Sequence, residues 1–195
     1  MTLHRPAPFP VPANGVYFAE SMHLKDFEAS LHKDPFHKII FIQRGRMELQ
    51  SKAGRNSVTV MGPERTLFAV PAGVRHRLLD HESSVILVLG LGDKFLRRDR
   101  DIWDIWQRLL VHPVSGRMME GGFAGWWRRA VLEQTLQGPG HAVTVRAMAM
   151  QVLVAADRHV SGPTDDSAGE RVRAVQRRVQ ETFFEDWSID RAAQR

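Results

Sequence analysis

The sequence has no cysteine among its 195 residues. Disulfide bonds and thiolate metal sites are therefore excluded, and the composition is compatible with a reducing cytoplasm. The N-terminal stretch lacks the apolar core of a signal peptide, and no apolar run is long enough to span a bilayer. We therefore expect a cytoplasmic protein with no membrane partner.

Lysine and arginine outnumber the acidic residues by 27 to 22, which gives a formal net charge of +5 at pH 7. Hydrophobic residues make up 43% and charged residues 25%, values that are ordinary for a globular protein. The chain is long enough for one sizeable core and a small appendage. Its basic excess favours polyanionic partners such as nucleic acid, although a solvated basic surface explains the same excess.

Residues 1–14 carry four prolines at alternating positions, which predicts an extended arm. From residue 15 to 92, short apolar or alternating segments are separated by turn residues, and Ser51–Ser57 is expected to be a hairpin loop. Many short strands at this spacing are typical of a sandwich or barrel. The predicted strands are Val16–Phe18, Met22–Leu24, Phe27–His32, Lys38–Gln43, Arg46–Gln50, Ser57–Met61, Thr66–Val70, His76–Asp80 and Val85–Gly90.

After Gly92 the spacing of apolar residues becomes that of helices. Helices are predicted over Ile102–Leu110, Phe123–Leu136 and Val143–Ala156. The third helix is apolar on nearly all sides and must therefore be buried on more than one side. Packing against a second copy of the chain would bury it, which predicts a homodimer. Burial between the barrel and neighbouring helices is the alternative.

The C-terminal stretch begins with a polar linker at residues 161–168. Ser167 and Glu170 have the spacing of a capping box, which predicts that a helix follows. One face of this helix is basic, and it is a candidate for contacts to the DNA backbone: Arg171, Arg173, Arg177 and Arg178. A solvated helix face is the alternative. Ser188 predicts the N-cap of another helix with only about two turns before Arg195, so we expect the sequence to be the first part of a longer one.

A strand, a tight turn and a second strand are predicted around Pro71-Ala72-Gly73, where glycine can take a positive φ. His76 comes early in the second strand, and Asp80 follows four residues later. This Pro-x-Gly-x-x-His spacing resembles the second motif of the cupin β-barrel. The resemblance implies an α+β protein that begins with a cupin-like β-barrel, a double-stranded β-helix, and places His76 inside it.

The first cupin motif, aligned on Gly45, implies that His32, Asp34 and Lys38 stand where the family has two histidines and a glutamate. Asp34 could still bind a transition metal, but the Lys38 ammonium opposes metal binding. We therefore expect no resident metal and no other cofactor, and the residues that would hold a metal are His32, Asp34 and His76.

A polar set in and near these motifs is predicted to bind a small polar ligand by hydrogen bonding: His32, Asp34, His37, Lys38 and His76. His37 and Lys38 are neighbours on one predicted strand, so they cannot both point inward if the strand is regular. For His76, a structural role with hydrogen bonds to backbone or to a neighbouring strand is the alternative.

The order of these parts resembles the AraC family of bacterial transcription regulators. The run Glu185–Ala193 resembles the opening of that family's DNA-binding domain, with Arg191 where an apolar residue is usual. The resemblance implies a cupin-like barrel over 15–92, a helical dimerisation region over 93–160, and over 169–195 the truncated start of an all-α helix-turn-helix domain. It also implies a homodimer, a small-molecule effector, no enzymatic activity, and promoter DNA bound through the full-length C-terminal domain.

Two other functions remain open at this point. A metal-dependent cupin enzyme, such as a dioxygenase or an isomerase, would use His32, Asp34 and His76. A barrel that binds nothing would serve dimerisation alone.

Overall fold

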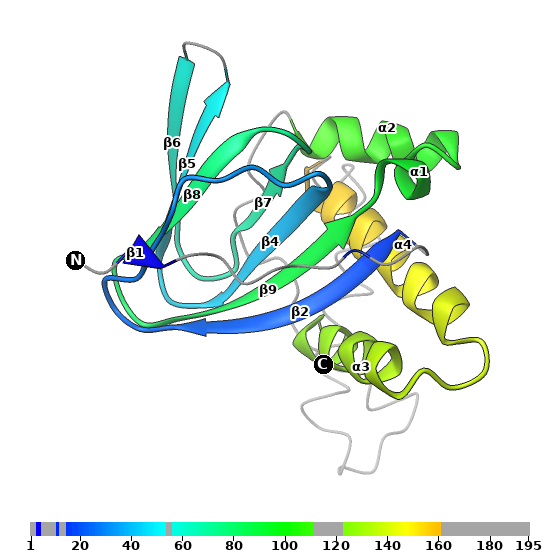
Figure 1. Ribbon diagram of the computed structural model, residues 1–195. Coiled ribbons are helices and arrows are strands. Elements are labelled where there is room, and N and C mark those ends of the chain that lie inside the picture. Colours follow the sequence, from blue (N-terminus) through cyan, green and yellow to red (C-terminus); the bar gives the residue numbers. More distant parts are fainter. Residues whose placement is uncertain (1–2, 5–10, 12–14, 54–55, 111–122, 161–195) are drawn as a thin grey trace, which may run out of the picture. The chain divides into compact units, whose positions relative to one another are not determined.

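The chain forms a strand-rich N-terminal part followed by helices in a computed structural model (Figure 1). The structure describes residues 3–4, 11, 15–53, 56–110 and 123–160. The strands are β1 (Leu3–His4), β2 (Val16–His23), β3 (Glu28–Ala29), β4 (His37–Arg44), β5 (Met47–Ala53), β6 (Asn56–Gly62), β7 (Leu67–Val70), β8 (Arg75–Asp80) and β9 (Ser84–Leu91). The helices are α1 (Asp93–Leu96), α2 (Arg100–Leu109), α3 (Phe123–Leu136) and α4 (His141–Val160).

The strands form two sheets, in the orders β1-β3-β8-β5-β6 and β2-β9-β4-β7. Among the described residues, the pairings of strands β2 to β9 with one another are antiparallel, and the short β1 pairs with β3 in parallel. From β2 to β9 this is the strand order of an eight-stranded jelly roll, the double-sheet architecture that cupins share. The described chain is therefore an α+β, cupin-like domain, as the sequence predicted.

Strand β4 is buried on both faces because each face contacts a different hydrophobic core. Ile40 and Ile42 belong to the core between the sheets. Ile39 and Phe41 belong to a second core, which the sheet shares with the helices. Burying one such side chain contributes about 2 kcal/mol, so the helices stabilise the barrel from outside.

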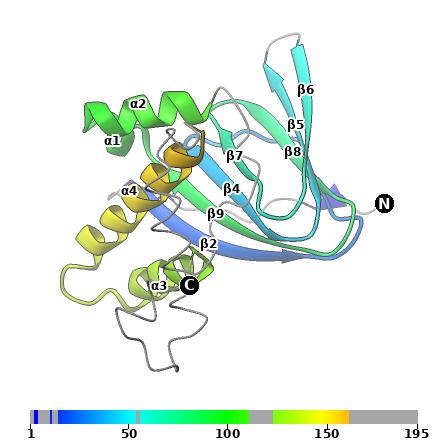
Figure 2. The same cartoon turned by 180° about the vertical axis from the view of Figure 1, so that it is seen from behind.

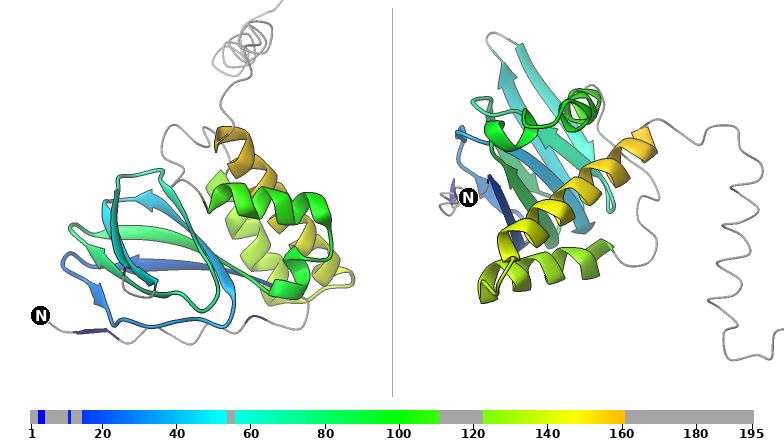
Figure 3. Two further views of the ribbon diagram at one scale, coloured as in Figure 1. Left: turned by 90° about the horizontal axis from the view of Figure 1, so that it is seen from above. Right: turned by 90° about the vertical axis from the view of Figure 1, so that its right-hand side faces the viewer.

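Helices α2, α3 and α4 gather at one side of the barrel, and the β5–β6 hairpin lies away from them (Figures 1 and 2). Figure 3 shows the same grouping from above, with α3 beside the edge strand β2. The Gln134 side chain bonds both the amide (2.9 Å) and the carbonyl (3.1 Å) of Phe18. Trp127 Nε1 donates to the Ala19 carbonyl at 3.0 Å. These bonds satisfy three backbone groups of β2 at Phe18 and Ala19, so this part of its outer edge is not a free template for another strand.

Several predicted boundaries are wrong. Val16–Phe18 and Met22–Leu24 belong to one strand, because β2 pairs with β9 without a break from Val16 to His23. Most of the expected loop Ser51–Ser57 belongs to the paired strands β5 and β6, since Ser51 pairs with Val58 and Lys52 with Ser57. In the predicted strand Phe27–His32 only Glu28–Ala29 is a strand, and the short helix α1 was not predicted.

Helix α4 buries one stripe within its own chain, made of Val145, Ala149, Val152, Leu153 and Ala156. On the opposite side Val143 is 62% exposed and Met150 is 37% exposed. Burial against the chain's own barrel and helices, the alternative considered above, therefore accounts for one face of α4. The opposite face is solvent-exposed in the single chain.

Other predicted segments lie largely or wholly outside the described residues. Most of the arm at 1–14 is among them, although Leu3–His4 is extended and forms β1. The linker 161–168 and the helix-turn-helix start 169–195, with Arg171, Arg173, Arg177 and Arg178, also lie outside the described part. No helix in the described ranges is both long and apolar enough to cross a membrane.

Candidate ligand-binding site

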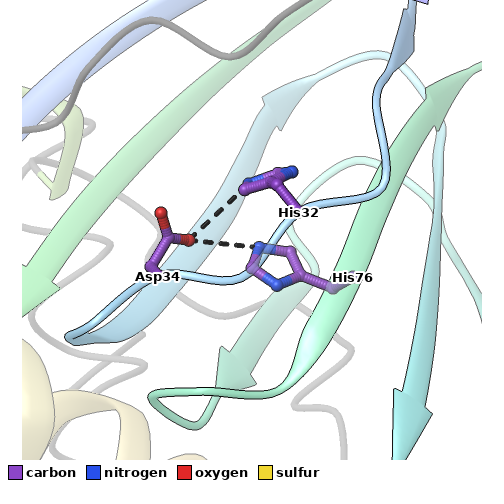
Figure 4. Close-up of side chains that lie close together, drawn as sticks. All are labelled: His32, Asp34 and His76. Carbon is purple, nitrogen blue, oxygen red and sulfur yellow. Dashed lines mark ion pairs between the residues drawn. The ribbon is translucent and has the colours of Figure 1, made fainter.

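Four polar side chains meet inside the barrel, from the segment between β3 and β4, from β4 itself and from β8. They are His32, Asp34, Lys38 and His76. His32 and His76 form an antiparallel bridge, with N–H to carbonyl distances of 3.1 and 2.8 Å. Figure 4 shows the Asp34 carboxylate facing both imidazoles. The predicted cupin-type spacing thus brings four of the five predicted residues together.

The turn before β8 holds this arrangement in place. Gly73 has a φ of 77°, as the sequence predicted, which a residue with a side chain adopts only under strain. The Gly73 amide donates to the Asp34 carbonyl at 2.8 Å. The turn therefore fixes the backbone of Asp34 next to the strand that carries His76.

Lys38 places its ammonium among the other three side chains. The residue is 9% exposed, and its Nζ lies 2.6 Å from Asp34 Oδ2 and 3.4 Å from His76 Nε2. The Asp34 contact is an ion pair, although its direction does not meet hydrogen-bond geometry, and Oδ2 has no hydrogen bond within the described chain. The site therefore already contains a positive charge at its carboxylate.

The two histidines of the site have the same tautomer. His32 Nδ1 lies 2.8 Å from the Ser30 carbonyl, and His76 Nδ1 lies 3.0 Å from the Val74 carbonyl. Because a carbonyl only accepts hydrogen bonds, each Nδ1 carries the proton and each Nε2 presents a lone pair. Asp34 Oδ2 lies 3.6 Å from His32 Nε2 and 3.5 Å from His76 Nε2. A histidine that binds metal is held in the same way.

Burial, and after it the positive charge of Lys38, lower the pKa of His76 to about 4, against a smaller opposing effect of the Val74 carbonyl. His76 is therefore neutral at pH 7. Its Nε2 accepts from the Lys38 ammonium, whereas His32 Nε2 has no hydrogen-bond partner in the described chain. The site thus offers one strong donor and several acceptors.

The donor atoms alone would suit a transition metal, because His32, Asp34 and His76 offer ligand atoms within 4.8 Å of one another. The Lys38 ammonium changes this conclusion. A divalent ion about 4 Å from a fixed unit charge is repelled by roughly 8 kcal/mol at an effective dielectric constant near 20. With Lys38 charged, the residues present do not fit a resident metal.

His37 does not join the other four predicted residues. It lies on the opposite face of β4, where Nε2 is 3.4 Å from Asp93 Oδ1 and Nδ1 accepts from the Ala72 amide at 3.2 Å. Its ring meets Trp106 edge-on at 5.0 Å. Burial lowers the pKa of His37, against the opposing effect of Asp93. The two-residue period of the strand is the reason for this correction.

A second polar cluster, which no motif in the sequence indicated, joins β2 to β8 and β9. His23 Nδ1 lies 2.8 Å from Asp80 Oδ2, and Ser21 Oγ lies 3.0 Å from His23 Nε2. Ser84 Oγ also donates to Asp80, which is 3% exposed. The Phe27 ring stacks on the His23 ring at 3.9 Å. We interpret this cluster as a structural link, in which each polar group of the buried carboxylate is satisfied.

No known protein family and no curated protein matches this sequence. Among solved structures, the chain is similar to a conserved protein of unknown function from Streptococcus pyogenes, with 20% identity over 40% of this chain and 65% of that chain and a TM-score of 0.37. An oxalate decarboxylase variant from Bacillus subtilis shows 14% identity over 44% of this chain and 23% of that one, with a TM-score of 0.39. The CENP-C cupin domain of Drosophila melanogaster shows 12% identity over 37% and 59%, with a TM-score of 0.35. The matched region spans less than two thirds of each of these structures. Likeness at this level concerns the fold alone, and our assignment of a cupin-like domain depends on the strand order described above.

Proposed function

We propose that this chain is the effector-binding and dimerisation portion of a ligand-responsive transcription regulator of the AraC type. The observation that carries the proposal is Lys38, whose ammonium lies at the carboxylate where a cupin enzyme would need a metal. Helices packed on the outer face of the barrel and the AraC-like run Glu185–Ala193 agree with it.

The barrel site has the chemistry of a small-molecule receptor. Lys38 offers a positively charged donor, and Asp34 and His32 Nε2 offer acceptors. Unpaired buried acceptors are costly, so a ligand with hydroxyl or amino donors would gain free energy by satisfying them. Such a ligand would also compete with Asp34 for the Lys38 ammonium and could thereby change the position of the segment that carries His32 and Asp34.

We also propose that a second copy of the chain covers the outer face of α4. Val143, Ala147 and Met150 are solvent-exposed and follow one another at the four- and three-residue spacing of a helix–helix seam. Replacing Val143 and Met150 together by glutamate is expected to give a monomer in sedimentation velocity. Val58→Glu, on the exposed face of β6, is the matched control. A wild-type chain that sediments as a monomer would remove this part of the proposal.

DNA binding tests the regulator directly. The chain should be expressed as its gene encodes it, with whatever sequence follows Arg195, and titrated by fluorescence anisotropy against DNA from upstream of its own gene and against scrambled DNA at matched salt. We expect the chain to prefer the upstream DNA and its affinity to change when an effector binds. Lys38→Ala should abolish this change of affinity, whereas Lys33→Met, on the exposed neighbouring loop, should leave it intact. Equal affinity for both DNAs, with or without effectors, would refute the proposal.

A metal-dependent cupin enzyme is the second candidate, favoured by the two imidazole lone pairs that face Asp34. Elemental analysis of protein purified without chelators separates the two. Stoichiometric iron, manganese, nickel or zinc would favour the enzyme and would contradict the role assigned to Lys38.

A further inference from the structure

A cavity lies outside the barrel, between the helix-facing side of the sheet and the start of α3. It is partly open to solvent and has a volume of about 420 Å³, within the range of roughly 300–1,000 Å³ that is typical of small-molecule sites. Its lining comes from β2, β4, β9, the turn between β6 and β7, and α3, and it shares no described residue with the barrel site. The cavity therefore joins the barrel to the helical layer.

A β-bulge at the end of β4 builds one wall of this cavity. The ladder with β9 pairs Ile42 with Ile86 and then Arg44 with Val85, so that Gln43 is the extra residue. On a regular strand, neighbouring side chains face opposite sides. Here Gln43 and Arg44 both line the same cavity, because a bulge redirects the side chain that follows it.

The apolar part of the lining includes two aromatic rings beside Met22, Val85 and Ala124. Phe41 and Phe123 meet edge-to-face, with ring centroids 4.9 Å apart and an interplanar angle of 69°. Both residues are 4% exposed, and they belong to the core that the sheet shares with the helices. A flat ring is the ligand shape that packs best against such a pair.

Among the described residues of the lining, one positive charge is left unmatched. Arg128 binds Glu20 through two contacts of 2.9 and 3.2 Å, and this pairing lowers the pKa of Glu20. Arg65 lies 3.9 Å from Glu64. Arg44 makes no ion pair within the described chain, so the cavity has a guanidinium available for an anion.

Gln43 provides a hydrogen-bonding group beside Arg44. Its Oε1 is buried and has no hydrogen-bond partner in the described ranges. Turning this amide toward a ligand would therefore break no existing bond of that oxygen. The two neighbours together suit a ligand that carries an anionic group and a second polar group.

We propose that this cavity binds a small aromatic carboxylate that also carries a hydroxyl or amino group. The ring packs against Phe41 and Phe123, the carboxylate pairs with Arg44, and the second polar group bonds to Gln43. In the regulator proposed above, on which this step rests, such a ligand fastens α3 to the sheet. Because α3 packs on α4, binding then favours one arrangement of the helical layer over others.

Salicylate is the probe, and salicylamide is its neutral counterpart with the same ring and hydroxyl. Titration calorimetry on the whole chain is expected to give salicylate an affinity at least about tenfold above that of salicylamide, since an Arg–carboxylate pair is a charge-assisted bond. Arg44→Gln is expected to remove this difference and to leave salicylamide binding unchanged. Arg98→Gln, an exposed arginine outside the lining, is the matched control and keeps the difference.

Lys38→Met separates the two sites, because it removes the charge of the barrel site and leaves the cavity intact. Salicylate binding that survives Lys38→Met and weakens with Arg44→Gln supports the cavity. Loss with Lys38→Met, equal affinity for the two probes, no effect of Arg44→Gln, or no salicylate binding at all would each overturn the proposal. If the site is confirmed but salicylate leaves DNA affinity unchanged, the binding site stands and its regulatory role is refuted.

Discussion

Replacing Lys38 by methionine is expected to turn the barrel site into a metal centre. Methionine keeps the length and apolar character of the lysine stem but removes the ammonium that lies 2.6 Å from Asp34 Oδ2. The remaining donors are two imidazole Nε2 atoms with their protons held on Nδ1, and one carboxylate. Such a set suits Co²⁺ or Zn²⁺.

The size of the effect follows from the charge that is removed. A unit charge about 4 Å from a divalent ion repels it by roughly 2 kcal/mol in bulk water and by roughly 8 kcal/mol at an effective dielectric constant near 20. The Lys38 side chain is 11% exposed and that of Asp34 is 17% exposed, so the site lies between these limits. An intermediate value of about 4 kcal/mol corresponds to metal binding roughly a thousandfold tighter than in the wild type.

Visible absorption of Co²⁺ reports coordination directly, and calorimetry with Zn²⁺ measures affinity. Lys33→Met removes a lysine from the same loop, but an exposed one, and should leave metal binding at the wild-type level. Lys38→Met combined with His76→Ala should lose the gain. Without metal, Lys38→Met should be less stable by about 1–3 kcal/mol, because Asp34 has lost its partner, and Co²⁺ should restore that stability.

Two results would refute the reasoning. In the first, Lys38→Met binds Co²⁺ no more tightly than Lys33→Met does, which would mean that the ammonium does not control the site. In the second, the wild-type chain itself binds one equivalent of metal tightly, which would mean that Lys38 does not keep the ion out of the site.

Three further outcomes follow from the described contacts. Asp80→Ala should lower the free energy of unfolding in urea by roughly 3 kcal/mol, because His23 and Ser84 lose their shared buried partner, whereas His81→Ala next to it should have little effect. The pKa of His76 falls from 6.5 to about 4 on folding. As the pH falls, the unfolded chain therefore takes up this proton first, and the free energy of unfolding should decrease by up to about 3 kcal/mol between pH 6.5 and pH 4. His76→Gln should flatten this dependence on pH. Trp127→Phe should cost about 1–2 kcal/mol by leaving the Ala19 carbonyl without its indole donor, and Trp126→Phe, at a half-exposed position, is the control.

The features that could be predicted from the sequence are local ones. Proline and glycine predict the turn Pro71-Ala72-Gly73, and the positive φ of Gly73 confirms this prediction. His32, Asp34, Lys38 and His76 were predicted as one set because the cupin spacing implies a barrel that brings their segments together. The strand order itself gives independent support to that barrel.

Other features depend on contacts that no local pattern reveals. The middle of β2 is polar and looks like a break, yet the unbroken ladder with β9 keeps it extended. Helix α4 looks apolar all round, but only one of its faces packs on the chain's own core. His37 carries the same chemistry as its neighbours in the predicted set, and only strand alternation separates it from them.

The two proposed sites lie on opposite faces of the same strand, so the register of β4 decides both. Lys38 faces the interior of the barrel, and Phe41, three residues on, faces the helices. Gly45 directly follows the strand with a φ of 92°, and a Cβ there would lie 2.7 Å from the Ser83 carbonyl oxygen. This close approach holds the end of β4 against the start of β9, next to the point where the bulge inserts Gln43. Because the bulge depends on this pairing between distant segments, Gln43 and Arg44 could not be recognised as neighbours in one cavity from their own sequence. A slip of one residue in the ladder would exchange the two faces of β4 and would remove both sites together.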